Sequence, residues 1–446
     1  MKVLFVASEM TPLAKVGGLG DVMGSLPKAL VQIGIETSVI IPLYEQIDRI
    51  KWRLKRLGGI NVGQENTIIY YTEIPAGDTG KVRIFLIENR RYLSRGPIYF
   101  DRTAFMNSRK ELERFLFFSR AVFEFVRRRD FFQPDIVHCN DWHSGALVAM
   151  LRNSPFGRSL EGRQNSNFKN QNLKTVFTIH NLANQGAFGG RNLMEEGIEN
   201  ADMVTTVSPS YAKEILTKEF GEGLENLLRR RDRKKELAGI LNGIDYEFWP
   251  LAKREKLVFQ KKIGLKQNIK SPIFGFVARL TSQKGVNLII PLVRKLVEEN
   301  GAQFVFLGQG EADYEKNLLK LGRDYRDLIC TKIGFDEKLA HDIYAQSDFF
   351  LMPSIFEPSG LGQMISMRYG TIPIVRATGG LRDSVRHLKT GFVFEKANPG
   401  ALFDAIKLAL RYFNHPAKMK KMIKNCQNQD FSWNKSAKKY RKLYEA

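Results

Sequence analysis

The sequence predicts an α/β protein built of two doubly wound domains with parallel sheets. Short apolar, β-branched runs alternate with longer segments of helical periodicity along its 446 residues. The short runs are almost continuously hydrophobic, which is typical of parallel strands covered by helices on both faces. The pattern occurs twice, and each half opens with a strand followed by a glycine-bearing loop. Two such domains facing each other would bind their ligands in one cleft, at the carboxyl ends of the strands.

The individual strands follow from these apolar runs. In the first half we expect strands at residues 3–7, 37–41, 82–87, 135–139, 175–179 and 203–207. In the second half we expect them at residues 272–277, 303–307, 348–352 and 372–375.

Three further segments complete the organisation. Residues 245–271 are polar, basic and poor in strand signal, and they are predicted to link a first domain at 1–244 to a second that begins at 272. Residues 153–174 are rich in Asn, Gln, Ser and Gly, which indicates a surface insertion. From about residue 400 to 446 the pattern indicates two basic amphipathic helices.

Composition excludes several classes of protein. Apolar residues make up 43% of the chain and charged residues 26%, as in ordinary globular enzymes, so a largely disordered chain is excluded. Three widely spaced cysteines exclude a disulfide scaffold and a zinc ribbon. The apolar run at the amino terminus is too short for a signal peptide, and no apolar run in the chain is long enough to span a membrane. We therefore expect a reduced, cytoplasmic protein.

The charge is strongly positive, with 69 Lys and Arg against 47 Asp and Glu, a net +22. Such a field attracts nucleotides, sugar phosphates, nucleic acids or acidic lipids. The excess is clustered at residues 127–129, 229–235 and 418–442. Solvated helix faces explain such clusters most simply, and aromatic residues are not regularly interleaved with them. We therefore predict neither a nucleic-acid nor a membrane partner.

The first candidate site is the segment KVGGLGD, residues 15–21, between the first strand and a helix. Its glycines allow a tight turn, and a helix amino terminus offers N–H groups to an anion. Lys15 adds a mobile positive charge, and Asp21 follows the glycines. The spacing matches neither the GxGxxG fingerprint nor the P-loop, and the simpler alternative is a plain strand–helix turn.

The second candidate site combines HCNDWH, residues 138–143, with TIHN, residues 178–181. His, Cys and Asp suggest zinc, but side chains diverge in such a turn and no second ligand cluster has zinc-site spacing, so no metal is predicted. Hydrogen bonding to a sugar, with Trp142 packing or stacking, is favoured. A histidine at a strand end is also often structural, and that alternative stays open.

Two further candidates lie in the second half. Arg279 and Lys284, five residues apart after a strand, suit a diphosphate, because Arg can bond two oxygens and Lys acts as a point charge. An exposed basic loop is the alternative. Glu357, within FEPSGLGQ, is either a helix cap or a holder of ligand hydroxyls. Residues 378–380, TGG, open another helix and could cradle an anion.

Together these motifs resemble the bacterial glycogen synthase and plant starch synthase family. The matching segments occur in the family's order along nearly the whole chain: KVGGLGDV (15–22), HCNDWH (138–143), TIHNLANQG (178–186), TTVSPSYAKEI (205–215), GILNGID (239–245), RLTSQKG (279–285), FEPSGLGQ (356–363) and RYGTIPIVRATGGLRDSV (368–385).

The resemblance implies a fold and a reaction. The fold is GT-B, with two Rossmann-like domains around a cleft, the second at 272–420, and a carboxyl-terminal helix at 421–446 packing back on the first. The reaction is transfer of glucose from ADP-glucose to the non-reducing end of an α-1,4-glucan such as glycogen, with retention of configuration. No metal or other cofactor is implied, and the oligomeric state is not indicated.

The resemblance also implies catalytic roles. Arg279 and Lys284 would stabilise the charge that develops on the leaving diphosphate. Glu357 would hold the glucose hydroxyls and support an oxocarbenium-like transition state, and His180 would contact the glucose. These four residues form the expected catalytic set.

The remaining implied roles concern binding. Donor contacts would come from Lys15, the backbone of Gly17 and Gly18, Asp21, Asn242, and the backbone of Thr378, Gly379 and Gly380. Asp141 would lie near the acceptor glucan.

Retention by double displacement needs a second carboxylate, and the position eight residues after Glu357 is Ile365, so front-side substitution fits better. The chain departs from the family at Asn184, Phe335, Ser359 and Gly362 and in a shortened segment at 186–201. Two alternatives stay open: another retaining GT-B enzyme using UDP-glucose or a small-sugar acceptor, and a catalytically weak glucan- or nucleic-acid-binding protein.

Overall fold

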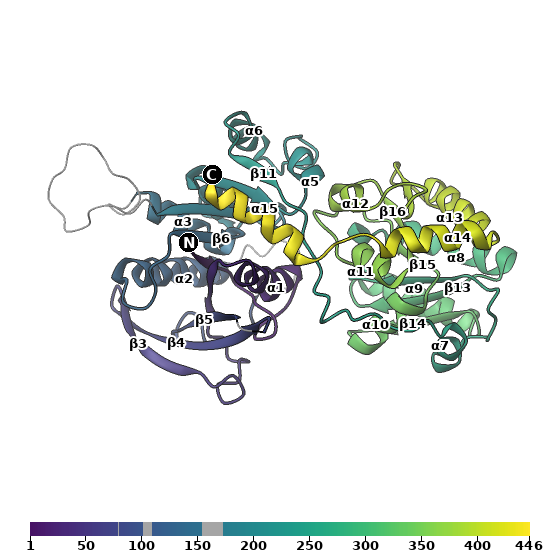
Figure 1. The fold of residues 1–446 in the computed structure, drawn as a ribbon, viewed down its shortest axis with the longest axis horizontal. Coiled ribbons are helices and arrows are strands. Elements are labelled where there is room, and N and C mark those ends of the chain that lie inside the picture. Colours follow the sequence, from purple (N-terminus) through teal and green to yellow (C-terminus); the bar gives the residue numbers. More distant parts are fainter. Residues whose placement is uncertain (79, 101–108, 154–172) are drawn as a thin grey trace. The chain divides into compact units, whose positions relative to one another are not determined.

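The computed structural model describes residues 1–78, 80–100, 109–153 and 173–446. They form two compact units (Figure 1). The first comprises Met1–Gly243 and Trp433–Ala446, and the second comprises Ile244–Ser432. Each unit is built on a largely parallel sheet with its own helices. The α/β class with two Rossmann-like units, predicted from the alternation of strands and helices, is confirmed.

The first unit contains a nine-stranded sheet in the order β11-β10-β7-β6-β1-β2-β5-β4-β3. Neighbours from β11 to β5 are parallel, whereas β4 and β3 are antiparallel additions at one edge. The strands are β1 (Lys2–Val6), β2 (Glu36–Pro42), β3 (Lys55–Val62), β4 (Glu65–Ala76), β5 (Gly80–Glu88), β6 (Ile136–Asn140), β7 (Lys174–Ile179), β10 (Met203–Thr206) and β11 (Leu237–Gly239).

All six strands predicted in the first half are present, but β3, β4 and β11 were missed. Strand β4 alternates buried and accessible residues because one of its faces is wetter, so it lacks the continuous apolar run of a parallel strand. Strand β3 contains two adjacent glycines and is mostly accessible, as an edge strand is. A two-stranded ribbon, β8 (Ala187–Phe188) with β9 (Arg191–Asn192), was also not foreseen. The predicted surface insertion at 153–174 falls almost entirely outside the described residues.

Helices of the first unit connect its strands. They are α1 (Gly18–Gln32), α2 (Arg109–Arg128), the 3-10 turn η1 (Trp142–Ser144), α3 (Gly145–Arg152), α4 (Leu193–Asn200), α5 (Pro209–Glu214), α6 (Glu225–Arg233) and α15 (Trp433–Glu445). Among the described residues, no helix has the length and apolar character needed to cross a membrane.

The second unit contains a six-stranded parallel sheet in the order β14-β13-β12-β15-β16-β17. Its strands are β12 (Ile273–Val277), β13 (Gln303–Gly308), β14 (Ile329–Ile333), β15 (Phe349–Met352), β16 (Ile372–Arg376) and β17 (Phe392–Phe394). Its helices are α7 (Lys256–Lys262), η2 (Ser282–Lys284), α8 (Val286–Asn300), α9 (Ala312–Asp324), α10 (Glu337–Gln346), α11 (Gly362–Tyr369), α12 (Gly379–Ser384), α13 (Pro399–Phe413) and α14 (Pro416–Gln427). The four predicted strands are all present, and β14 and β17 at the two edges were missed.

The segment expected as a linker, residues 245–271, belongs to the second unit and contains helix α7. Its anchor is an ion-pair triad. The Asp348 carboxylate accepts from the Lys256 Nζ at 2.7 Å and from the Arg254 guanidinium at 2.5 Å. The Lys256 side chain is only 4% exposed, so this triad fixes the segment to the start of β15.

The carboxyl-terminal region also differs from expectation. It forms three helices rather than two, since Asn414 and His415 separate α13 from α14, which begins at Pro416. A helix at 421–446 was expected to pack on the first unit, and in the structure only α15 belongs to that unit. Helix α14 stays in the second unit because it buries Met419, Met422 and Cys426 there.

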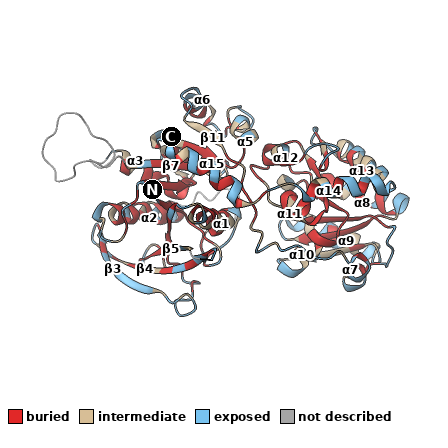
Figure 2. Ribbon diagram, viewed as in Figure 1, coloured by how far each residue is buried: buried red, intermediate tan, exposed pale blue. Residues whose placement is uncertain are grey.

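Each sheet lies in an apolar core (Figure 2). In the second unit Phe274 stacks on both Phe304 and Phe349, with ring centroids 5.2 Å apart in each pair. Burying one such ring stabilises the fold by roughly 1.5–3 kcal/mol. The rigid sheets hold the loops at the carboxyl ends of their strands, where the candidate residues lie.

Candidate active site

The candidate residues of the first unit gather at the carboxyl edge of its sheet. Asp141 directly follows β6, and His180 directly follows β7, its neighbour in the sheet. The KVGGLGD segment follows β1. Strand β6 lies between β1 and β7 in the sheet and pairs with both. Because neighbouring parallel strands end at one edge, these three sequence-distant segments lie side by side.

Asp141 holds the start of the His180 loop. Its Oδ1 accepts hydrogen bonds from the backbone N–H of His180 at 2.7 Å and of Asn181 at 3.4 Å. Its backbone has φ 53° and ψ 179°, a conformation that is strained for any residue but glycine. Burial raises the pKa of Asp141 to about 7, although the two backbone N–H groups lower it. The acceptor role implied for Asp141 stays a proposal, since this carboxylate is already engaged with the protein.

The ring of His180 contacts the last residue of β6. Its Nε2 lies 2.9 Å from Asn140 Oδ1. Burial lowers the pKa of His180 to about 3, so the ring is neutral at physiological pH. A neutral imidazole carries one donor and one acceptor nitrogen and suits a sugar hydroxyl better than a phosphate.

The glycine-rich loop is organised by Glu9, which sequence reasoning missed. Its Oε2 accepts from the backbone N–H of Val16 at 2.6 Å and of Gly17 at 2.8 Å, and its Oε1 accepts from the Tyr99 hydroxyl at 2.6 Å. The N–H of Gly17 is thus bonded to a carboxylate in this structure, and its role in an anion cradle stays a prediction. The available signal was an acidic residue three positions after a buried strand.

The other residues of this loop differ in how much space surrounds them. Lys15 and Asp21 form an ion pair at 2.6 Å, and both are partly exposed. Gly18 begins helix α1, and a side chain there would meet open space. Gly20 has no such room, since a Cβ would come within 3.2 Å of Glu9 and of Lys15.

Two other predicted residues of the first unit are buried. Asn242 is 6% exposed, and its Oδ1 finds no hydrogen-bond partner among the described residues. Trp142 is 1% exposed and packs edge-on against Phe115, so it packs rather than offering a face for stacking. Within the described ranges no group of three His, Cys, Asp or Glu is placed to hold a metal ion.

The second unit repeats this plan with different chemistry. Arg279 and Lys284 follow β12, Glu357 follows β15, and the 378–380 turn follows β16. These three strands are neighbours in the sheet. Lys284 Nζ donates to Glu357 Oε2 at 2.5 Å, and the Ser354 hydroxyl donates to the same oxygen at 3.0 Å. The Glu357 side chain is 8% exposed, so a largely desolvated ion pair forms the centre of this site.

Arg279 lies in the same loop but is exposed. One of its guanidinium nitrogens donates to Gln283 Oε1 at 3.3 Å. Gln283 also binds the next loop, donating to the Phe356 carbonyl at 3.3 Å and accepting from the Ile355 N–H at 2.8 Å. The loops that carry Lys284 and Glu357 are thus tied together by backbone as well as by charge.

The TGG turn packs directly against the Glu357 loop. A Cβ at Gly379 would lie 2.0 Å from the Glu357 carbonyl, and one at Gly380 would lie 2.1 Å from that of Ser359. The Gly380 N–H donates to the carbonyls of Glu357 and Pro358, and the anion cradle expected at 378–380 stays a prediction. Thr378 is buried at the start of the turn.

Arg376 is a further residue that sequence reasoning missed. Its guanidinium donates to the backbone carbonyls of Ser354 at 2.9 Å and of Ile355. It therefore fixes the backbone just before Glu357. An arginine at the end of an apolar strand was the only signal for it.

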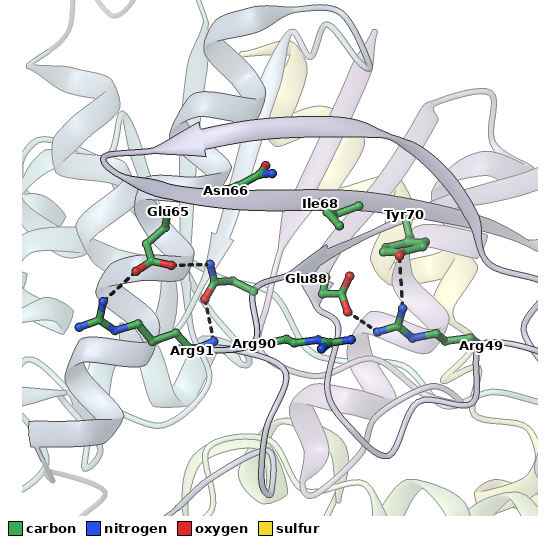
Figure 3. Close-up of a pocket in the computed structure, with 9 residues that line it drawn as sticks. Arg49, Glu65, Asn66, Ile68, Tyr70, Glu88, Arg90 and Arg91 are labelled. Atoms are coloured by element: carbon green, nitrogen blue, oxygen red, sulfur yellow. Dashed lines mark hydrogen bonds and ion pairs between the residues drawn. The ribbon is translucent and has the colours of Figure 1, made fainter.

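A separate pocket lies beside β4 and β5 in the first unit (Figure 3). Four of its five charged residues form ion pairs: Arg49 with Glu88, and Arg91 with Glu65 at 2.9 Å. None of the predicted site residues lines it.

Comparison with known proteins agrees with this geometry. Residues 2–230 match the family described as "Starch synthase catalytic domain", and residues 259–429 match "Glycosyl transferases group 1". The chain is 38% identical to the glycogen synthase of Alkaliphilus metalliredigens, with all of both chains covered. It is 39% identical to that of Clostridium perfringens, with 100% of this chain and 98% of the relative covered.

Solved structures give the same result. The catalytic domain of starch synthase IV from Arabidopsis thaliana, bound to ADP and acarbose, has a TM-score of 0.84 at 30% identity, covering 99% of this chain and 98% of that one. Sucrose-phosphate synthase from Thermosynechococcus elongatus shares the fold, with a TM-score of 0.66 at 19% identity, covering 100% of this chain and 98% of that one.

The fold and the paired cation and carboxylate at its strand ends define a glycosyltransferase of the GT-B class. Within that class, the chain belongs to the family of the bacterial glycogen synthases and the starch synthases. The resemblance predicted from the eight ordered motifs is confirmed.

Proposed function

We propose that the chain transfers glucose from ADP-glucose to the non-reducing end of an α-1,4-glucan, with retention of anomeric configuration. The observation that carries the proposal is the partly buried Lys284–Glu357 pair at the carboxyl edge of the second sheet. Family membership supports it, as does the related starch synthase that binds ADP and acarbose. The second unit would supply the groups that bind the donor diphosphate, and the first unit would supply the acceptor site and further donor contacts.

The chemistry follows from the charges. When the bond between the anomeric carbon and the diphosphate oxygen breaks, negative charge develops on the leaving group. Lys284 would then donate to a diphosphate oxygen, and Arg279, free to swing in its exposed loop, would add a second cation. The Glu357 carboxylate would bind sugar hydroxyls and favour positive charge at the anomeric carbon. No metal or cofactor enters this scheme.

Retention would proceed by front-side substitution. The new bond forms between the anomeric carbon and the acceptor 4-oxygen, and the acceptor proton passes to the leaving phosphate oxygen. A double displacement would need a carboxylate nucleophile. The residue eight positions after Glu357 is Ile365, which is apolar and buried in α11.

The remaining implied roles belong to this proposal. Lys15, Asp21 and Asn242 would contact the donor, as would the backbone at Gly17 and Gly18 and at 378–380 once ligand binding releases the N–H groups engaged here. Asp141 would lie near the acceptor. We place the activity in the cytoplasm, which the three free cysteines support.

The test is transfer of labelled glucose from ADP-glucose, and in parallel UDP-glucose, onto glycogen in the presence of EDTA. We expect transfer from ADP-glucose. Transfer from UDP-glucose alone would overturn the donor assignment, and transfer that EDTA abolishes would overturn the metal-free scheme.

Variants connect the activity to the site. Glu357→Gln and Lys284→Met should each lower kcat by about a hundredfold or more, because an electrostatic partner of the transition state is lost. Lys320→Met removes an exposed ion pair with Asp324 in the same unit and serves as the matched control. Equal activity in Lys284→Met and Lys320→Met would refute the role of Lys284.

A further inference from the structure

Asn140 lies between the protein backbone and the ring of His180. It is the last residue of β6 and is 1% exposed. Its Nδ2 is 3.1 Å from the His138 carbonyl oxygen and 3.2 Å from the Val6 carbonyl oxygen. Its Oδ1 is 2.9 Å from His180 Nε2.

These contacts determine which end of the amide faces the ring. A backbone carbonyl can only accept a hydrogen bond. The amide end that lies between two carbonyls must therefore be the NH₂ group, and the end that faces His180 must be the oxygen. The reverse orientation would bury an amide oxygen against two carbonyl oxygens.

The amide orientation determines the tautomer of the histidine. Since an amide oxygen accepts only, the His180 nitrogen facing it must carry a proton. Burial keeps the pKa of His180 at about 3, so the ring holds one proton at neutral pH. That proton is on Nε2, and Nδ1 keeps its lone pair.

The main chain of His180 is held separately. Its N–H donates to Asp141 Oδ1 at 2.7 Å, so the backbone is anchored by one neighbour and the ring by the other. Asn140 is itself fixed, because its own N–H and carbonyl both bond the Ser144 hydroxyl, at 2.7 Å and 3.0 Å. The ring consequently has little freedom to reorient.

We infer that Asn140 is a positioning residue that fixes His180 as the Nε2–H tautomer, so that His180 meets its ligand as a hydrogen-bond acceptor through Nδ1. The group it takes is a hydroxyl that donates, as sugars present, and neither a phosphate nor a carbonyl oxygen. That the sugar is the transferred glucose rests on the proposed function, whereas the tautomer does not.

The tautomer can be observed directly. Two-bond ¹H–¹⁵N correlation spectra of protein labelled with ¹⁵N-histidine distinguish the two neutral tautomers and the imidazolium. The chain has six histidines, and the signal lost in His180→Gln assigns His180. Those of His341, His387 and His415, in the second unit, are internal references. We expect the Nε2–H form for wild-type His180 at neutral pH, and an Nδ1–H form or an imidazolium would overturn the inference.

Two variants test whether Asn140 is the cause. Asn140→Leu removes the acceptor, and the preference for Nε2–H should fall by about tenfold, which is what one hydrogen bond is worth. Asn140→Asp, protonated on the oxygen that faces the two carbonyls, keeps an acceptor oxygen towards His180 and should keep the proton on Nε2. An unchanged tautomer in Asn140→Leu would overturn the role, and if that variant does not fold, the wild-type and Asn140→Asp spectra still decide.

Kinetics complete the test. Asn140→Leu should lower kcat about tenfold or more, and Asn140→Asp should restore part of it. Asn61→Leu, at an exposed position on β3, is the matched control and should leave both kcat and the spectra unchanged. Loss of kcat without a change of tautomer would indicate a merely structural role. Absence of glucose transfer by the wild type would refute the proposed function and leave the tautomer result standing.

Discussion

His143 should make the first unit sensitive to acid. It is 5% exposed and packs against Trp142, Phe115 and Tyr99, with ring centroids 4.2, 4.5 and 5.3 Å away. Its ring nitrogens have no hydrogen-bond partner among the residues that the structure describes. Burial, with a smaller contribution from His180, lowers the pKa of His143 from 6.5 to about 3.

The direction in which stability changes with pH follows from proton binding. Below about pH 6.5 the unfolded chain binds a proton at this position and the folded chain does not, so stability is complete above that pH and is lost as the pH falls towards 3. A pKa of 6.5 unfolded and about 3 folded corresponds to about 3 kcal/mol between about pH 7 and about pH 4. Asp141, whose pKa is raised, acts in the opposite direction, but its contribution cancels when two variants are compared.

The perturbation is His143→Leu, with the exposed His415→Leu as control. Urea unfolding would be measured at both pH values and followed by hydrogen exchange and mass spectrometry, which reads peptides of the two units separately. We expect the loss of stability between the two pH values to be about 3 kcal/mol smaller in His143→Leu than in wild type or the control. An equal loss in all three proteins would refute the reasoning, since the buried ring would then not be the group that titrates.

Three further predictions concern other contacts. Tyr444→Phe removes the hydroxyl that lies 2.6 Å from His138 Nδ1, in a fully buried contact, and should cost about 1–3 kcal/mol in denaturant unfolding of the first unit; an unchanged midpoint would contradict this. Asp348→Asn leaves the buried Lys256 ammonium without its anionic partner and should destabilise the second unit by about 3–5 kcal/mol in the same assay, more than loss of an exposed ion pair. Arg376→Ala frees the backbone before Glu357 and should lower kcat about tenfold or more with little change in KM; a rise in KM alone would contradict a positioning role.

The parallel strands could be predicted from sequence because a strand buried on both faces consists of consecutive apolar residues. Every strand buried on both faces was found as a continuous apolar run. The edge strands β3, β11, β14 and β17 were not, since an edge strand is partly accessible and depends on its neighbour for its conformation. That α14 belongs to the second unit and α15 to the first was also not predicted, because the unit against which a helix packs depends on tertiary contacts.

The candidate site was predictable to a similar extent. Lys284 and Glu357 were predicted from motifs 73 positions apart, and the structure joins them in an ion pair. Glu9, Asn140 and Arg376 were not predicted as site residues. Each acts through a distant partner, as Glu9 does through a tyrosine 90 positions away, and no local pattern records such a contact. The binding roles of the glycines in both turns stay predictions, and the N–H groups of Gly17 and Gly380 bind protein oxygens in this structure.

The return of the last helix to the first unit dictates an order of assembly. The ribosome makes the whole second unit, Ile244–Ser432, before it reaches the residues of α15. At ordinary rates of synthesis this takes on the order of 10 to 40 s. Throughout that time the surface around His138, which Tyr440 and Tyr444 later cover, stays open. A nascent chain therefore completes its second unit first, and a chain that ends early keeps an apolar surface that chaperones and proteases recognise.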